Sequence, residues 1–146
     1  MEIKAYQADF LEDLALIYLD SRRDAFYWTD PGSYHLSDFK EDTQGERIWV
    51  ALEEGKVLGF IAVWQADHFI HHLYVDKAYY RKGIGQCLIE EVYRFYQAPL
   101  RLKCLSKNKR AISFYQSQGF KVLDKGVDNL GEYCLLQLKS LNHTNA

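Results

Sequence analysis

Hydrophobic and polar positions follow two different periods along the chain, and each period predicts one kind of secondary structure. Strict alternation marks segments such as 47–53, where Ile48, Val50 and Leu52 share one face of a strand. Apolar residues recur every three or four positions in 83–96, which predicts an amphipathic helix. The predicted strands cover residues 3–6, 47–53, 57–65, 69–75, 100–105, 120–123 and 132–138. The predicted helices are one that Asp9 caps and that fades near Arg22, a short one that Ser37 caps with Phe39 inward, 83–96, and 108–118 with Gly119 as its end.

The order of these elements predicts one mixed α/β domain. Three strands joined by tight turns come first in the sheet region, and helices cross between later strands. The 146 residues suit a single domain. We assign that domain to residues 1–140 and expect residues 141–146 to form a frayed tail.

Composition and charge exclude several classes of protein. Apolar residues make up 48% of the chain and charged residues 26%, which argues against disorder. The formal net charge of −2 offers no basic surface for nucleic acid. No apolar run reaches the ~18 residues of a membrane span, and the first residues lack the apolar stretch of a signal peptide. Cys87, Cys104 and Cys134 lack metal-ligand spacing, so we expect buried free thiols in a cytoplasmic protein without a metal.

A glycine-containing loop between a predicted strand and a predicted helix suggests an anion site. Gly83 and Gly85 have no β-carbon, so a ligand can approach the main chain there. The first turn of a helix also has unpaired N–H groups and the positive end of the helix dipole, which suit a pyrophosphate. The dinucleotide motif GxGxxG is excluded because Cys87 and Leu88 follow, and no Walker loop is present. A plain helix start with flexible glycines is the alternative.

Two motifs in this order resemble the GNAT acyltransferase superfamily. The family's Q/R-x-x-G-x-G/A motif is matched by Gly83-Ile84-Gly85, although Tyr80 stands in the leading position. A second family pattern, N-x-x-A-x-x-F/L-Y-x-x-x-G-F, is matched by Asn108, Ala111, Phe114, Tyr115, Gly119 and Phe120. The element order fits the family over nearly the whole chain, and the first 60 residues match by pattern alone.

The resemblance implies a mostly antiparallel mixed sheet with about four helices, and an N-acetyltransferase that uses acetyl-CoA as its acyl donor. The acceptor would be a primary amine of a small molecule or peptide. The pantetheine arm would pair with the main chain of 73–75, and the general acid that protonates the leaving sulfur would be Tyr115. Asn108 would contact the cofactor arm, or it simply caps its helix. The implied acetyl-CoA contacts are Leu73, Tyr74, Val75, Tyr80, Arg81, Lys82, Gly83, Ile84, Gly85, Gln86, Asn108 and Tyr115.

The general base is the least determined part of the site. Many family members use a glutamate on the fourth or fifth strand, but Lys103 occupies the fifth-strand position here. The fourth strand offers His71 and His72, and histidine is suited to proton removal near neutral pH. Alternation along a strand sends the two side chains to opposite faces, so at most one should reach the acceptor. We prefer His71; a buried histidine without a catalytic part is the alternative.

The acceptor site would be formed by aromatic residues that could equally pack the core. The candidates are Phe26, Tyr27, Trp28, Trp64 and Tyr133, with Asp30 and Asp128 as acidic groups for a cationic amine. Two other functions stay open: an acyl-CoA sensor without turnover, and an acetyltransferase for protein or tRNA. A homodimer is compatible with the sequence, and neither nucleic acid nor membrane is an expected partner.

Overall fold

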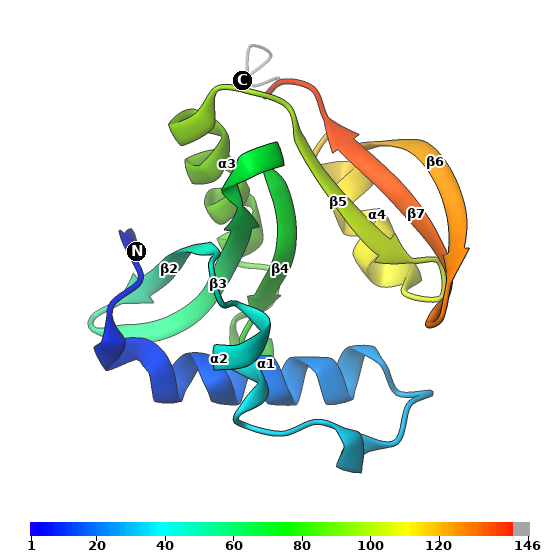
Figure 1. The fold of residues 1–146 in the computed structure, drawn as a ribbon. Helices are drawn as coiled ribbons and strands as arrows, with labels where there is room; N and C mark the ends of the chain where they lie inside the picture. Colours follow the sequence, from blue (N-terminus) through cyan, green and yellow to red (C-terminus); the bar gives the residue numbers. More distant parts are fainter. Residues whose placement is uncertain (142–146) are drawn as a thin grey trace.

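The computed structural model describes residues 1–141 and has the expected α/β architecture, with four α-helices and one seven-stranded sheet in that range (Figure 1). The strands are β1 (Glu2–Ala5), β2 (Arg47–Glu53), β3 (Lys56–Trp64), β4 (Phe69–Val75), β5 (Leu100–Leu105), β6 (Lys121–Asp128) and β7 (Gly131–Leu138). The helices are α1 (Leu11–Ala25), α2 (Asp38–Asp42), α3 (Ile84–Tyr96) and α4 (Lys109–Ser117). The predicted order of strands and α-helices is therefore confirmed; the domain boundary at residue 140 stays a prediction, and residues 142–146 of the predicted tail lie outside the described range.

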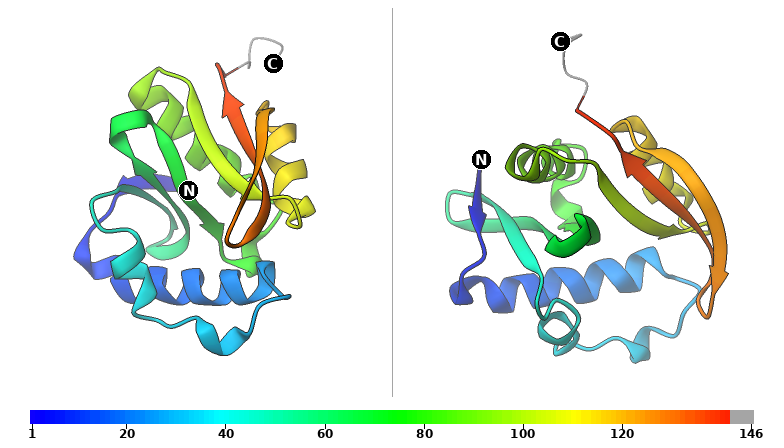
Figure 2. Two further views of the ribbon diagram at one scale, coloured as in Figure 1. Left: turned by 45° about the vertical axis from the view of Figure 1, so that its right-hand side comes forward. Right: turned by 45° about the horizontal axis from the view of Figure 1, so that its top comes forward.

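The sheet has the strand order β1-β2-β3-β4-β5-β7-β6 and is antiparallel except where β4 meets β5. That parallel pairing is short: Phe69 faces Arg101 and Ile70 faces Leu102. Beyond these two pairs the strands diverge toward their C-terminal ends (Figures 1 and 2). We call the region between 71–75 of β4 and 103–105 of β5 the fork.

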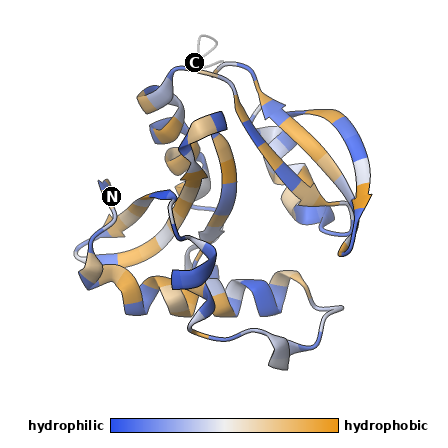
Figure 3. Ribbon diagram, in the orientation of Figure 1, coloured by the Kyte–Doolittle hydropathy of each residue, from blue (hydrophilic) through white to orange (hydrophobic). Residues whose placement is uncertain are grey.

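Two apolar clusters cover the two faces of the sheet. On one face α1 and α2 pack on β2 and β3 through residues such as Leu14, Phe39 and Phe60. On the other face α3 and α4 pack on β3, β4, β5 and β7, with Leu88 and Leu136 at the centre. Coloured by hydropathy, β5 shows alternating apolar and polar positions, whereas β3 is largely apolar (Figure 3). The face of the sheet that meets α1 and α2 is called the acceptor face below.

Local signals at the helix ends explain both a success and two errors of the prediction. Asn108 caps α4, since its side-chain oxygen accepts a hydrogen bond from the N–H of Ala111 at 3.2 Å. Asp9 does not cap α1: it lies in a 3₁₀ turn, and Phe10 occupies the cap position without a side-chain bond. Ser37 precedes α2 but makes no capping bond either. A polar residue before a segment of helical apolar spacing thus predicted where each helix lies, but it did not predict which residue caps the helix.

The three cysteines are free, as predicted, but they are not equally buried. Cys104 and Cys134 are buried on neighbouring strands, and burial raises the pKa of Cys104 to about 12. Cys87 is only partly buried, so the expectation of a buried thiol is wrong there because its helix position faces the margin of the core. Within residues 1–141, no helix is long and apolar enough to span a bilayer, and no cluster of three or more potential ligands could hold a metal ion.

Candidate active site

The fork leaves one edge of β4 without a strand partner over its C-terminal half. The N–H of Asp76 donates to the carbonyl of Leu58 on β3. Because the main-chain groups of an antiparallel strand alternate between its two edges, Leu73 and Val75 turn their N–H and C=O groups toward the fork. An extended ligand with amide groups can pair with this edge as an added strand would.

The loop between β4 and α3 presents the start of a 13-residue helix to the fork side of the sheet. Gly83 is the N-cap residue with φ of 75°, a left-handed conformation that favours glycine, and a β-carbon there would meet nothing within 4 Å. Main-chain N–H groups of the first turn are therefore accessible to an anion. Arg81 and Lys82 are exposed beside them, and the guanidinium of Arg110 lies 4.7 Å from the ring centre of Tyr80.

Gly85 is required for a different reason, which joins the two sequence motifs in space. A β-carbon at Gly85 would lie 2.9 Å from the ring of Phe114 on α4. The absence of a side chain on α3 thus allows α4 to approach closely. Gln86, the next residue, is exposed and donates to Glu90 at 2.9 Å, one turn further along α3.

We expect Gly83→Val to weaken acetyl-CoA binding by about 1–3 kcal/mol, because a side chain would keep the pyrophosphate away from its N–H partners. Calorimetric titration with acetyl-CoA measures the effect. Gly55→Val is the matched control, since Gly55 also has a positive φ, of 79°, and free space around it, but lies in the β2–β3 turn. Equal affinities of the Gly83 variant and wild type for acetyl-CoA would show that the loop does not form part of the acetyl-CoA site.

Tyr115 lies on α4 against the core on the side of the fork. Its surroundings raise the pKa of its hydroxyl well above the ordinary value, mainly through burial and also through the nearby Cys104 and Tyr74. The hydroxyl therefore keeps its proton at any pH at which the protein is used. Asn108, at the other end of α4, spends its side-chain oxygen on the helix cap described above.

His71 and His72 lie on the same face of the sheet, so the prediction of opposite faces is wrong. Pairing between β3 and β4 shifts register after Ala62, which faces His72, whereas Val63 faces Ile70. The extra residue is His71, and this β-bulge turns both imidazoles to the acceptor face. Their ring centres are 6.1 Å apart, and the ring of His71 stacks on Trp64 at 6.3 Å with an angle of 9° between the planes.

Glu46, which the sequence analysis did not single out, joins the two histidines. It precedes β2, and its side chain is only 3% exposed. One carboxylate oxygen is hydrogen-bonded to Nδ1 of His71, and the other lies 3.9 Å from Nε2 of His72. Burial raises the pKa of Glu46, and the hydrogen bond from His71 opposes that rise. A single acidic residue in a polar turn gives no sequence signal of a functional role. The bulge in β4 and the pairing of distant segments bring Glu46 next to the histidines.

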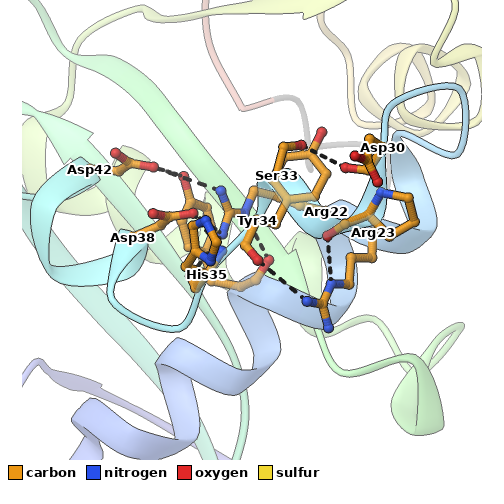
Figure 4. A network of polar contacts seen from close by, with 10 residues as sticks. Arg22, Arg23, Asp30, Ser33, Tyr34, His35, Asp38 and Asp42 are labelled. Atoms are coloured by element: carbon orange, nitrogen blue, oxygen red, sulfur yellow. Dashed lines mark hydrogen bonds and ion pairs between the residues drawn. The ribbon is translucent and has the colours of Figure 1, made fainter.

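His72 is tied to the end of α2. Its Nε2 lies 3.4 Å from the main-chain oxygen of Asp42, whose carboxylate accepts from the hydroxyl of Tyr18 at 2.7 Å. Arg22, with a side chain 8% exposed, bonds Asp38 at 3.2 Å and lies 3.9 Å from Asp42 (Figure 4). Burial of its imidazole disfavours the charged form of His72 and lowers its pKa to about 4. His72 is thus neutral near pH 7.

Protonation of His72 should couple folding to pH. Because burial depresses its pKa in the folded state to about 4, its contribution to stability is present above the unfolded value of 6.5 and is lost as pH falls toward 4. The shift corresponds to up to about 3 kcal/mol. The free energy of unfolding is measured by chemical denaturation of wild type and His72→Gln at pH 7.5, 6 and 4.5. Between pH 7.5 and 4.5 it should fall less in the variant than in wild type, by up to this amount. His35→Gln, at an exposed histidine, should keep the wild-type slope; an equal slope in His72→Gln would show that His72 is solvated.

The predicted acceptor residues fall into three separate groups. Phe26, Tyr27 and Trp28 contact one another after α1, and Nζ of Lys107 lies 5.6 Å from the ring of Trp28. Trp64 stacks on His71 as described. Tyr133 lies beneath Lys103, which pairs with Asp128 at 2.7 Å. Asp30 accepts from the N–H of Gly32 in its own turn. Among the described residues of these groups, Trp64 alone contacts the histidine pair, and Lys103 forms an ion pair with Asp128.

Comparison with known proteins identifies the family of this fold and site. The family profile described as "Acetyltransferase (GNAT) domain" matches residues 44–122, more than half of the chain. The chain belongs to the GNAT acetyltransferase family. The match covers β2 to the start of β6, and so includes the fork, the Gly83 loop and Tyr115.

Relatives with assigned names agree with this assignment. The peptidyl-lysine N-acetyltransferase YiaC of Escherichia coli is 38% identical over 100 residues, which are 68% of this chain and 65% of YiaC, slightly under two thirds of that protein. The peptidyl-lysine N-acetyltransferase YjaB of Salmonella typhimurium is 33% identical over 70% of this chain and 69% of YjaB.

Solved structures share the GNAT fold over almost the whole chain. Apo-YjaB from Escherichia coli superposes with a TM-score of 0.74 and 24% identity, covering 94% of this chain and 95% of that one. The PaiA N-acetyltransferase of Thermoplasma acidophilum, solved in complex with coenzyme A, gives 0.76 at 20% identity, with 95% and 99% covered. The predicted fold class and family are therefore confirmed.

Proposed function

We propose that this protein transfers the acetyl group of acetyl-CoA to a primary amine, with the side chain of a peptidyl lysine as the favoured acceptor. The observation on which this rests is the fork, where β4 and β5 stop pairing and leave an unpaired strand edge, with the start of α3 and Tyr115 on the elements beside it. Acetyl-CoA has a matching group for each of these features: the amides of pantetheine for the strand edge, the pyrophosphate for the helix start and the thioester sulfur for Tyr115.

The two faces of the sheet would supply the two proton transfers. Tyr115 packs with the α3 and α4 cluster, whereas His71 and His72 lie on the acceptor face. Tyr74 connects the two sides, since it is close enough to affect the titration of Tyr115 and its ring centre lies 6.4 Å from that of His72. A thioester in the fork would thus have an acid on one side and a base on the other.

The reaction needs only these groups and good positioning. The amine nitrogen attacks the thioester carbonyl carbon and loses a proton to Nε2 of His71, whose Nδ1 is engaged by Glu46. The carbon–sulfur bond breaks, and the hydroxyl of Tyr115 gives its proton to the departing thiolate. Tyr115 then regains a proton from solvent, and the protonated His71 releases its proton to solvent. His72, with its pKa of about 4, is too weak a base for this role near neutral pH.

A lysine side chain suits the acceptor side better than a large rigid molecule. The side chain of His71 is 39% exposed, and its neighbours Trp64 and Phe69 are aromatic, so an aliphatic arm can pass along them. The names of YiaC and YjaB support the same substrate class.

The test is turnover with a panel of acceptors: lysine peptides, peptides with a free N-terminus only, polyamines and aminoacyl-tRNA. Release of coenzyme A and the mass of the acetylated product are measured together. We expect product with lysine peptides. Binding of acetyl-CoA without product from any acceptor would make the protein an acyl-CoA sensor instead, and product from another acceptor alone would correct the substrate class.

A further inference from the structure

Glu46 has one carboxylate oxygen that is buried and makes no hydrogen bond within the described residues. A buried acceptor without a partner costs free energy, and such costs are concentrated at functional sites. The other oxygen is hydrogen-bonded to Nδ1 of His71. With its side chain 3% exposed and His71 placed over it, Glu46 cannot touch a substrate itself. Any catalytic effect of this carboxylate must pass through an imidazole.

We propose that Glu46 is a positioning residue that holds His71 in the tautomer with its proton on Nδ1, so that Nε2 faces the acceptor as the base. This inference rests on the proposed function for its kinetic consequence, but the tautomer itself is a property of the free protein. A carboxylate bound to one imidazole nitrogen fixes the protonation of the other and stabilises the imidazolium formed on proton transfer. The sequence around Glu46 contains no motif that would predict this role.

Contacts around the pair explain why His71, and not His72, receives this help. The stacked ring of Trp64 and the edge of Phe69 fix the plane of the His71 imidazole. Nε2 of His72 is directed at the main-chain oxygen of Asp42, and 3.9 Å separates it from the carboxylate of Glu46. The bulge in β4 is what lets both imidazoles approach one carboxylate.

The charged groups near the pair come from four elements. Asp42, at the end of α2, disfavours the charged form of Glu46, and Arg22 on α1 disfavours protonation of His72. Asp67 and Arg101 line a pocket of about 470 Å³ that adjoins Phe69. None of these replaces Glu46 as the hydrogen-bond partner of Nδ1 of His71.

A double-mutant cycle tests whether Glu46 acts through His71. Glu46→Gln keeps the shape and an acceptor oxygen but removes the charge. We expect it to lower kcat roughly 10-fold or more in the wild type, to leave KM for acetyl-CoA unchanged and to move the acidic limb of the pH–rate profile to lower pH by about one unit. In a His71→Ala background the same change should have no further effect. Glu53→Gln, an exposed glutamate at the end of β2, is the control.

The second measurement needs no activity. Nitrogen-15 spectra of the His71 ring at pH 9 should show the proton on Nδ1 in wild type and a redistribution between the two nitrogens in Glu46→Ala. An equal loss of kcat from Glu46→Gln with and without His71, or a His71 tautomer that ignores Glu46, would overturn the inference. Loss of turnover with every acceptor, combined with the expected tautomer shift, would refute the proposed function and leave this assignment intact.

Discussion

Tyr115→Phe should lower kcat by about 10²- to 10⁴-fold while the affinity for acetyl-CoA stays nearly constant. The phenyl ring fills the same space against Phe114 and Phe120, so packing is kept and only the hydroxyl is lost. A general acid contributes to the chemical step and not to binding, and the range given is typical for one. Steady-state kinetics at saturating donor and acceptor, together with calorimetric titration of acetyl-CoA, separate the two effects.

Tyr93→Phe provides the control, because Tyr93 on α3 is also partly buried against the same apolar cluster. It should keep wild-type turnover. If Tyr115→Phe also keeps it, the hydroxyl has no part in the chemistry, and Tyr115 is a core aromatic residue.

His71→Ala should slow turnover by about 10²-fold or more and flatten the acidic limb of the pH–rate profile. A base must be neutral to accept a proton, so the wild-type rate falls as pH drops and the imidazole is protonated. Removing the imidazole removes that limb, and turnover then depends on the small fraction of free amine. The measurement is kcat as a function of pH between 5 and 9, an interval roughly centred on the ordinary titration of histidine.

His72→Gln should leave the limb in place, since the pKa of His72, about 4, lies below the range in which the limb falls. Its loss should appear in stability instead. If the His71 and His72 variants both keep the wild-type profile, the limb belongs to the acceptor amine and the enzyme has no side-chain base. If His72→Gln alone abolishes the limb, the roles of the two histidines are reversed.

The parts of the site that the sequence predicted are those in which one residue type has a local reason. Gly83 needs a positive φ, Gly85 needs the absence of a β-carbon under Phe114, and Asn108 caps the helix that it precedes. Each of these reasons acts over a few residues or through a fixed motif spacing. Tyr115 follows from the motif; it lies on α4 near Cys104 and Tyr74, and its catalytic role stays a prediction.

The parts that were missed depend on pairings between distant segments. The bulge after Ile70 is set by how β3 and β4 align, and it reversed the argument from alternation at His71. Glu46 meets His71 across 25 positions of sequence, and nothing in the turn before β2 distinguishes it from the exposed acids nearby. Two adjacent histidines in an otherwise apolar strand were the available signal, because two polar rings on one strand call for a buried partner.

A crystal structure with a coenzyme A–lysyl peptide conjugate tests the central claim most directly, since one ligand then reports both halves of the site. The account predicts the pyrophosphate at the first turn of α3 beside Gly83, and the pantetheine paired with the main chain of Leu73 and Val75. The linking sulfur should lie near the hydroxyl of Tyr115, and the lysine arm should leave toward His71 and Trp64. A conjugate bound outside the fork, or a lysine arm directed away from the acceptor face, would contradict it.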